Sequence, residues 1–172
     1  MQQSGIIFVA MAVVVTFAAA SNILNDIFDI NIDSVNQPMR PLPSGEISLY
    51  LVSVYMIILY VTGIYFTFSL PKTAIQIAFG LVLPILILYT PILKRIPLLG
   101  NIAIGVVLGC VFLFAEAALT GKVSDMWTPA WLTFGLTFIR ELVKDIEDMD
   151  GDRKDAARTF PAVFGIKRSL QL

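Results

Sequence analysis

The sequence predicts an all-α polytopic membrane protein, and three observations lead to this fold class. Hydrophobic residues make up 57 % of the 172 residues and charged residues only 15 %. A soluble domain carries about 25 % charged residues. The mean hydropathy is +0.81, and the apolar residues are gathered in long runs. Such runs cross a bilayer as helices, because a helix satisfies its backbone hydrogen bonds internally.

Membrane spans can be located with a window of about 20 residues. We expect five of them, at residues 5–24, 48–70, 73–93, 98–120 and 127–143. Two of the polar segments outside these spans, residues 25–46 and 144–168, are long and charged.

Basic residues predict the orientation of the spans. If the spans alternate, ten of the 12 Lys and Arg fall on one side and only Lys72 and Lys122 on the other. Because loops rich in Lys and Arg stay in the cytoplasm, we expect the long charged segments on the cytoplasmic face of the cell membrane. Residue 1 then lies outside, which leads us to expect a further helix upstream.

Composition argues against several classes of function. A net charge of −1 gives no indication of a nucleic-acid partner. The sequence has no histidine, which removes histidine acid–base chemistry and histidine-ligated zinc. The single cysteine, Cys110, can form no intrachain disulfide and is expected to pack in the core.

Two acidic clusters follow membrane spans. Asn25, Asp29 and Asp33 are spaced i, i+4 and i+8, so they line one face of a helix. The second cluster, Asp145, Asp148 and Asp152, is spaced i, i+3 and i+7. It shares one face with Glu141 if the helix continues through residue 151.

Clustered carboxylates need a cation to compensate them. Two carboxylates about 6 Å apart repel by roughly 3 kcal/mol at an effective dielectric of about 20, and the helix dipole at a C-terminal end is also negative. Oxygen-only ligands suit Mg²⁺ or Ca²⁺, and Mg²⁺ completes its shell with water and substrate phosphate. We therefore expect a Mg²⁺–diphosphate site. The alternative is a solvated acidic interface that keeps the helix ends in water.

Three segments together resemble the motifs of the UbiA-type superfamily of intramembrane prenyltransferases. The first is Asn-x-x-x-Asp-x-x-x-Asp with a following Arg-Pro-Leu-Pro-Ser-Gly, at residues 25–45. The second is Asp-x-x-x-Asp with a later Arg-Thr-Phe-Pro, at residues 148–161. The third is Tyr-Thr-Pro-x-x-Lys-Arg, at residues 89–95.

The resemblance implies a nine-helix bundle around a lipid-facing cavity, with both acidic motifs at its cytoplasmic mouth. Residues 1–172 are then expected to form a single membrane domain that corresponds to helices two to six. The helices that close the cavity would lie outside this portion, so activity of the portion alone is not implied.

The resemblance also implies roles for individual residues. Mg²⁺ would be held by Asn25, Asp29, Asp33, Asp145, Asp148 and Asp152. The catalytic carboxylates would be those of Asp29, Asp33, Asp148 and Asp152. The diphosphate of a polyprenyl diphosphate donor would be bound by Arg40, Lys94 and Arg95. The same three basic residues would otherwise serve only to mark the cytoplasmic face.

The sequences of residues 33–45 and 140–148 resemble those of one branch of the family. That branch transfers geranylgeranyl groups to geranylgeranylglyceryl phosphate in the biosynthesis of isoprenoid membrane lipids. An aromatic acceptor, as in the quinone or chlorophyll branches, is the first alternative. A non-enzymatic cation channel or transporter is the second, although its basic loops would oppose cation entry. An inactive relative is the third.

Overall fold

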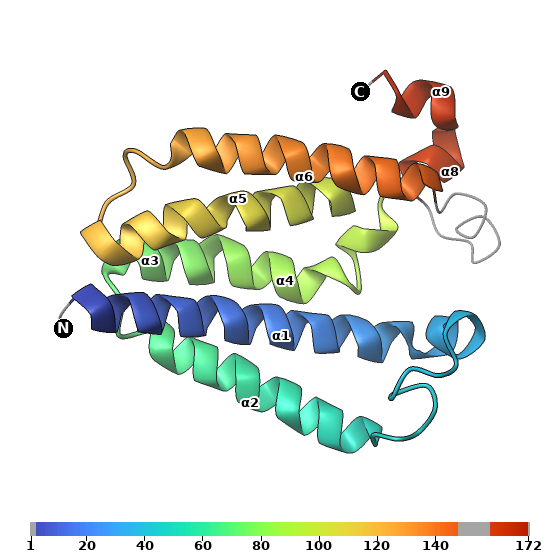
Figure 1. Ribbon diagram of the computed structural model, residues 1–172, viewed down its shortest axis with the longest axis horizontal. Coiled ribbons are helices and arrows are strands. Elements are labelled where there is room, and N and C mark those ends of the chain that lie inside the picture. The colour runs from blue at the N-terminus through green and yellow to red at the C-terminus, as the bar shows by residue number, and fades with distance from the viewer. Residues whose placement is uncertain (1–2, 148–158, 172) are drawn as a thin grey trace. The chain divides into compact units, whose positions relative to one another are not determined.

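The computed structural model describes residues 3–147 and 159–171. Within these ranges the regular structure is helical and contains no strand, which confirms the predicted fold class. Figure 1 shows the elements in order. They are α1 (Gln3–Asn36), α2 (Leu49–Thr67), α3 (Lys72–Ile77), a π-helical turn (Ala78–Val82), α4 (Leu83–Tyr89), a 3-10 turn (Leu93–Arg95), α5 (Leu99–Thr120), α6 (Trp127–Glu147), α8 (Phe160–Phe164) and α9 (Ile166–Ser169).

Several helical stretches of the described chain are long and apolar enough to cross a membrane. They are Gln3–Asn36, Leu49–Thr67, Lys72–Tyr89 and Leu99–Thr120. These four overlap the first four predicted spans, although their limits differ, and they make the chain a multi-pass membrane protein. The fifth predicted span is helix α6, whose apolar run ends at the charged residues Arg140, Glu141 and Lys144. Helix α6 therefore exists as predicted, but it does not reach the apolar length of the other four.

The chain folds into two compact units, which are described separately. The first contains Met1–Ile87 and Phe114–Val123, and the second contains Leu88–Leu113 and Ser124–Leu172. Helix α5 contributes its last turns to the first unit and its earlier turns to the second. The first acidic motif belongs to the first unit, and the basic turn and Asp145 belong to the second.

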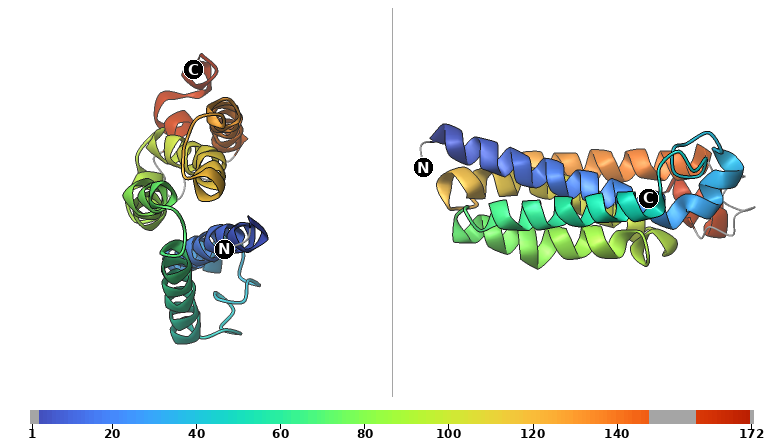
Figure 2. Two further views of the ribbon diagram at one scale, coloured as in Figure 1. Left: turned by 90° about the vertical axis from the view of Figure 1, so that its left-hand side faces the viewer. Right: turned by 90° about the horizontal axis from the view of Figure 1, so that it is seen from below.

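Helices α1 and α2 lie side by side in the first unit (Figure 2). Val13, Phe17 and Ala20 are buried along one face of α1. A Cβ atom on Gly63 of α2 would lie 2.5 Å from a ring carbon of Phe17 and 2.7 Å from the hydroxyl of Thr16. Only glycine fits at this contact, so the two helices can approach closely there. The contact packs the middle of α1, the helix whose C-terminal end carries the acidic motif, against α2.

A π-helical turn joins α3 to α4 into one rod. Pro84 has no N–H to donate, and its ring crowds the carbonyl of Gly80 four residues earlier, which disfavours a regular α-helix there. At the start of the rod, the hydroxyl of Thr73 donates to the carbonyl of Gly121 at 2.7 Å. This bond ties α3 to the end of α5. Helix α4 ends at Tyr89, before the predicted limit of the span at residue 93.

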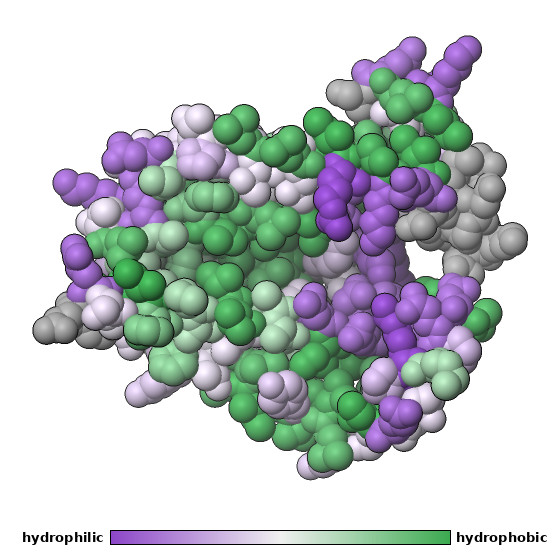
Figure 3. Space-filling view, viewed as in Figure 1, coloured by the Kyte–Doolittle hydropathy of each residue, from purple (hydrophilic) through white to green (hydrophobic). Residues whose placement is uncertain are grey.

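Most of the apolar surface of α2 faces outward. Only Gly63 and Thr67 of this helix are buried, and large residues such as Tyr50, Leu51 and Tyr65 are exposed. Figure 3 shows hydrophobic residues over the middle of α1 and α2, and hydrophilic residues gathered where α1 runs into the loop that follows it. An apolar surface of this kind is stable against lipid rather than water.

Candidate functional site

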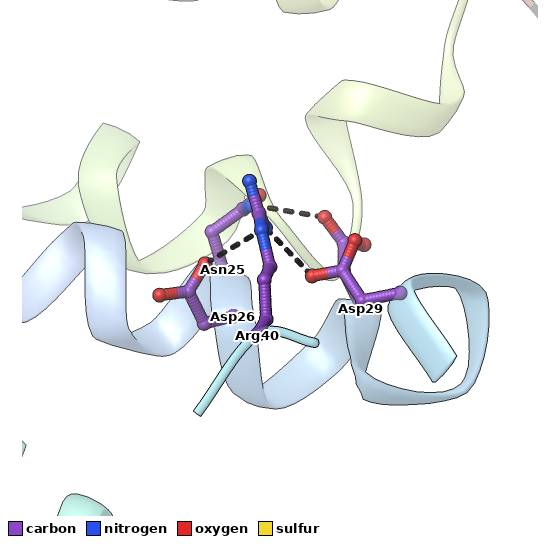
Figure 4. Close-up of polar contacts among 5 residues, drawn as sticks. Asn25, Asp26, Asp29 and Arg40 are labelled. Carbon is purple, nitrogen blue, oxygen red and sulfur yellow. Dashed lines mark hydrogen bonds and ion pairs between the residues drawn. The ribbon is translucent and has the colours of Figure 1, made fainter. Parts of the chain in front are cut away.

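The first acidic motif lies on the last turns of α1. The helix continues to Asn36, so Asn25, Asp29 and Asp33 occupy successive turns of one helix, as their spacing predicted. The side-chain amide of Asn25 donates to Oδ2 of Asp29 at 2.8 Å (Figure 4). This hydrogen bond restricts the rotamers of both side chains. A ligand that approaches the cluster therefore meets oxygens that are already oriented.

Arg40 folds back onto the same helix. The N–H of Gln37 donates to the carbonyl of Asp33 at 2.7 Å, and the N–H of Arg40 donates to the carbonyl of Gln37 at 3.0 Å. These turns bring the Arg40 guanidinium to 2.7 Å from Oδ2 of Asp33 and 3.7 Å from Oδ1 of Asp26. Figure 4 shows Arg40 reaching toward Asp26. The sequence did not predict either contact with a carboxylate, because Arg40 was expected to bind the diphosphate or else only to mark the cytoplasmic face.

The side chains of this cluster differ in their exposure to solvent. The Asp33 side chain is 12 % exposed, whereas those of Arg40 and Asp26 are 45 % and 53 % exposed. The charge of Asp33 is therefore the least screened by water and the most dependent on its partner. A guanidinium has five N–H donors, so a half-exposed Arg40 can hold Asp33 and contact a second anion from its open side.

Lys94 and Arg95 lie in the 3-10 turn that connects α4 to α5. The side chains of both are exposed. The turn is closed by hydrogen bonds from the N–H of Arg95 to the carbonyl of Ile92 at 3.2 Å and from Ile96 to Leu93 at 3.1 Å. The structure therefore presents two adjacent cations on a short, hydrogen-bonded turn. This geometry suits the contact with an anion that was predicted for them.

Asp145, on the last turn of α6, is held by a residue that the sequence analysis did not single out. The side-chain amide of Asn101 on α5 donates to Oδ2 of Asp145 at 2.8 Å. Asn101 is 8 % exposed, and it interrupts the apolar run that opens α5. This polar residue in an apolar run could have been recognised from the sequence, because a polar side chain in an apolar helix needs a hydrogen-bond partner. Asp148 and Asp152 lie outside the described residues.

The side-chain oxygen atoms of the described residues are suitable ligands for Mg²⁺ that is bound together with phosphate. Within residues 3–147 and 159–171, no three Asp, Glu, Cys or His side chains form a group that could hold a metal ion by themselves. Mg²⁺ is usually bound through one or two carboxylates, with waters and substrate phosphates completing its shell. Asn25, Asp29 and Asp33 offer such a partial oxygen set, and Asp145 offers another in the second unit.

The fold and these residues define a class, a polytopic helical membrane protein with amide, carboxylate and guanidinium groups at the end of a membrane helix. The sequence matches the UbiA prenyltransferase family over residues 2–172. The chain belongs to this family, as the resemblance of its motifs predicted.

Curated relatives carry the name digeranylgeranylglyceryl phosphate synthase. The chain is 40 % identical over 163 residues to that of Natronomonas pharaonis, which covers 94 % of this chain and 58 % of the relative. It is 39 % identical over 170 residues to that of Methanospirillum hungatei JF-1, which covers 96 % of this chain and 59 % of the relative. The chain thus spans somewhat less than three fifths of the length of these relatives.

Solved structures share the fold. One described as digeranylgeranylglyceryl phosphate synthase in membranes is similar with a TM-score of 0.75 at 36 % identity, covering 95 % of this chain and 58 % of that one. A UbiA homologue from Archaeoglobus fulgidus, solved with DMAPP and Mg²⁺ bound, is similar with a TM-score of 0.83 at 20 % identity. That likeness covers 99 % of this chain and 61 % of the homologue, and it concerns the fold.

Proposed function

We propose that the protein performs Mg²⁺-dependent transfer of a polyprenyl group from a prenyl diphosphate to a lipid acceptor. The observation that carries the proposal is the cluster of Asn25, Asp29, Asp33 and Arg40 at the end of a membrane helix. In a chain of the prenyltransferase family, this cluster has the charges that a diphosphate and its metal require.

The proposed site residues are those expected from the sequence. The residues that would hold Mg²⁺ are Asn25, Asp29, Asp33, Asp145, Asp148 and Asp152, and the bound ion would supply positive charge that stabilises the leaving diphosphate. Arg40 binds the diphosphate through the guanidinium N–H groups that do not contact Asp33. Lys94 and Arg95 bind it from their exposed turn. The described contacts support the roles of Asn25, Asp29, Asp33 and Arg40 most directly, because Asn25 is hydrogen-bonded to Asp29 and Arg40 is paired with Asp33 on the same helix end.

The proposed reaction is an alkyl transfer. The allylic C–O bond of the donor breaks, and its electron pair leaves with the diphosphate. The acceptor hydroxyl oxygen bonds to the prenyl carbon, and its proton passes to a carboxylate or to the departing diphosphate. No histidine is needed for this proton transfer, which agrees with the absence of histidine from the sequence. The apolar helices shield the electron-poor carbon from water.

We further propose that the donor is geranylgeranyl diphosphate and the acceptor geranylgeranylglyceryl phosphate. The names of the curated relatives and the wording of residues 33–45 support this acceptor. To test the proposal, the purified full-length protein in lipid nanodiscs is given geranylgeranyl diphosphate with this acceptor. Parallel reactions contain 4-hydroxybenzoate, homogentisate or a dihydroxynaphthoate. We expect product only from the glycerol lipid, and none after EDTA. Transfer to an aromatic ring alone would contradict the acceptor, and undiminished transfer in EDTA would contradict the metal.

We also propose that the loops before α2 and before α5 face the cytoplasm of a cell and that the loop before α6 faces the other side. The distribution of Lys and Arg supports this orientation. In a Cys110→Ala background, single cysteines at the exposed positions Ser44 and Lys122 are labelled with an impermeant maleimide in intact cells. We expect labelling at position 122 and protection at position 44 until the cells are opened. Equal labelling of both positions in intact cells would refute the orientation.

A further inference from the structure

The first turn of α5 contacts two parts of the second unit that carry charge. Gly100 faces the 3-10 turn, because a Cβ atom there would lie 3.2 Å from Cα of Lys94 and 3.4 Å from the carbonyl oxygen of Leu93. Asn101, the next residue, donates its side-chain amide to Asp145 at 2.8 Å. Two consecutive residues therefore contact the basic turn and the acidic end of α6.

The backbone that enters this turn is unusual. Leu98 has a φ of 64°, a left-handed conformation that costs a non-glycine residue about 1–2 kcal/mol. Its carbonyl accepts the N–H of Ile102 at 2.9 Å, so it already belongs to the hydrogen-bonding pattern of α5. A strained residue persists where the surrounding contacts determine its position. Two such contacts follow directly after Leu98, that of Gly100 with the backbone of Lys94 and that of Asn101 with Asp145.

The chemistry of Asn101 is specific for this contact. Its amide is buried, so loss of the partner would leave a donor without a hydrogen bond in an apolar region. A leucine, which has the same branched shape and number of side-chain heavy atoms, would supply no donor, and an aspartate would place a second negative charge beside Asp145. Asparagine is neutral, and its amide donates to the carboxylate and leaves the carboxylate charge in place.

We propose that Asn101 is a positioning residue for metal binding, which it supports by fixing the carboxylate of Asp145. The inference rests on the proposed function, in which Asp145 is one of the groups that hold Mg²⁺. Hydrogen-bond partners behind a metal ligand set its orientation, and their loss typically lowers metal affinity by about 10- to 100-fold. Asn101 itself contacts neither metal nor substrate in this proposal.

The test measures metal binding separately from prenyl transfer. Mn²⁺ with inorganic pyrophosphate is the probe, and free Mn²⁺ is followed by electron paramagnetic resonance in the purified protein. We expect Asn101→Leu to weaken Mn²⁺ binding at least about tenfold. Asn101→Ser is measured as a second variant. Its folding is less at risk, because the serine hydroxyl can donate a hydrogen bond to a backbone carbonyl of its own helix. Thr137→Val is the matched control, because Thr137 is a buried polar residue of α6 about two turns before Asp145.

A double-mutant cycle decides whether Asn101 acts through Asp145. In an Asp145→Asn background, Asn101→Ser should cause no further loss of Mn²⁺ affinity. A full additional loss there, or unchanged affinity in both folded single variants, would overturn the proposal. If the unsubstituted protein binds Mn²⁺ with this dependence but transfers no prenyl group, the proposed function fails and the positioning role stands. If the unsubstituted protein binds no Mn²⁺, both fail.

Discussion

Asp29→Asn is expected to lower prenyl transfer by at least about a hundred- to thousandfold, the scale on which loss of a group that stabilises developing charge reduces kcat. The substitution keeps the size of the side chain and can retain a hydrogen bond with Asn25, but it removes the negative charge proposed to hold the metal. The protein should remain folded, because removing one carboxylate from a repulsive cluster relieves repulsion. Single-turnover transfer in nanodiscs measures the loss, and the thermal unfolding midpoint measures the fold.

Glu46→Gln is the matched control for that result. Glu46 is an exposed acid in the loop before α2, so the substitution removes the same charge without touching the acidic motif. We expect transfer by this variant to stay within about twofold of the unsubstituted protein, since surface charges away from a site contribute little. Comparable losses of transfer in both variants would indicate an effect of net charge rather than of the site. A fully active Asp29→Asn protein would show that the Asp29 carboxylate has no role in the reaction.

Lys94→Ala and Arg95→Ala are expected to raise the KM for the prenyl diphosphate by about 10- to 100-fold each, because a hydrogen bond to a charged group contributes about 1.5–3 kcal/mol. The KM for the acceptor should change much less, since the proposed contacts are to the diphosphate. Initial rates with each substrate varied in turn separate the two constants. The effect should shrink at high salt for these exposed side chains.

Lys72→Ala is the control for the two basic residues. Lys72 opens α3 and is one of the two lysines expected on the opposite side of the membrane. It should leave both constants unchanged. Equal increases in donor and acceptor KM for Lys94→Ala would indicate that the basic turn supports the fold rather than the diphosphate.

Helical periodicity made much of the fold and part of the site predictable. The i, i+4, i+8 spacing of Asn25, Asp29 and Asp33 requires a helix if the three groups are to share a face, and α1 extends through all of them. The apolar runs predicted four spans that the structure shows as helices of sufficient length. Their limits were less predictable, because α1 continues to Asn36, well past the apolar run, through Asn, Asp and Ser residues that are weak helix formers.

Contacts between segments were not predictable from spacing. Arg40 reaches Asp33 because the chain after α1 turns back on itself through two backbone hydrogen bonds, and nothing in the composition of that loop specifies this path. Asn101 and Asp145 are 44 residues apart, so no local pattern links them. Leu98 is a residue type that rarely adopts positive φ, so its conformation follows from the packing around it rather than from its identity.

The length of α1 has a consequence for how substrate arrives. At about 1.5 Å per residue, residues 5–24 span about 30 Å, which matches the hydrocarbon thickness of a bilayer. In an upright helix Asn25 then lies at the hydrocarbon boundary, and Asp29 lies about 6 Å further out, at headgroup depth. In the proposed reaction, a prenyl diphosphate at that depth would keep its tail among the acyl chains. It would reach the carboxylates by lateral diffusion within one leaflet, so its supply would be set by its mole fraction in the bilayer rather than by its concentration in water.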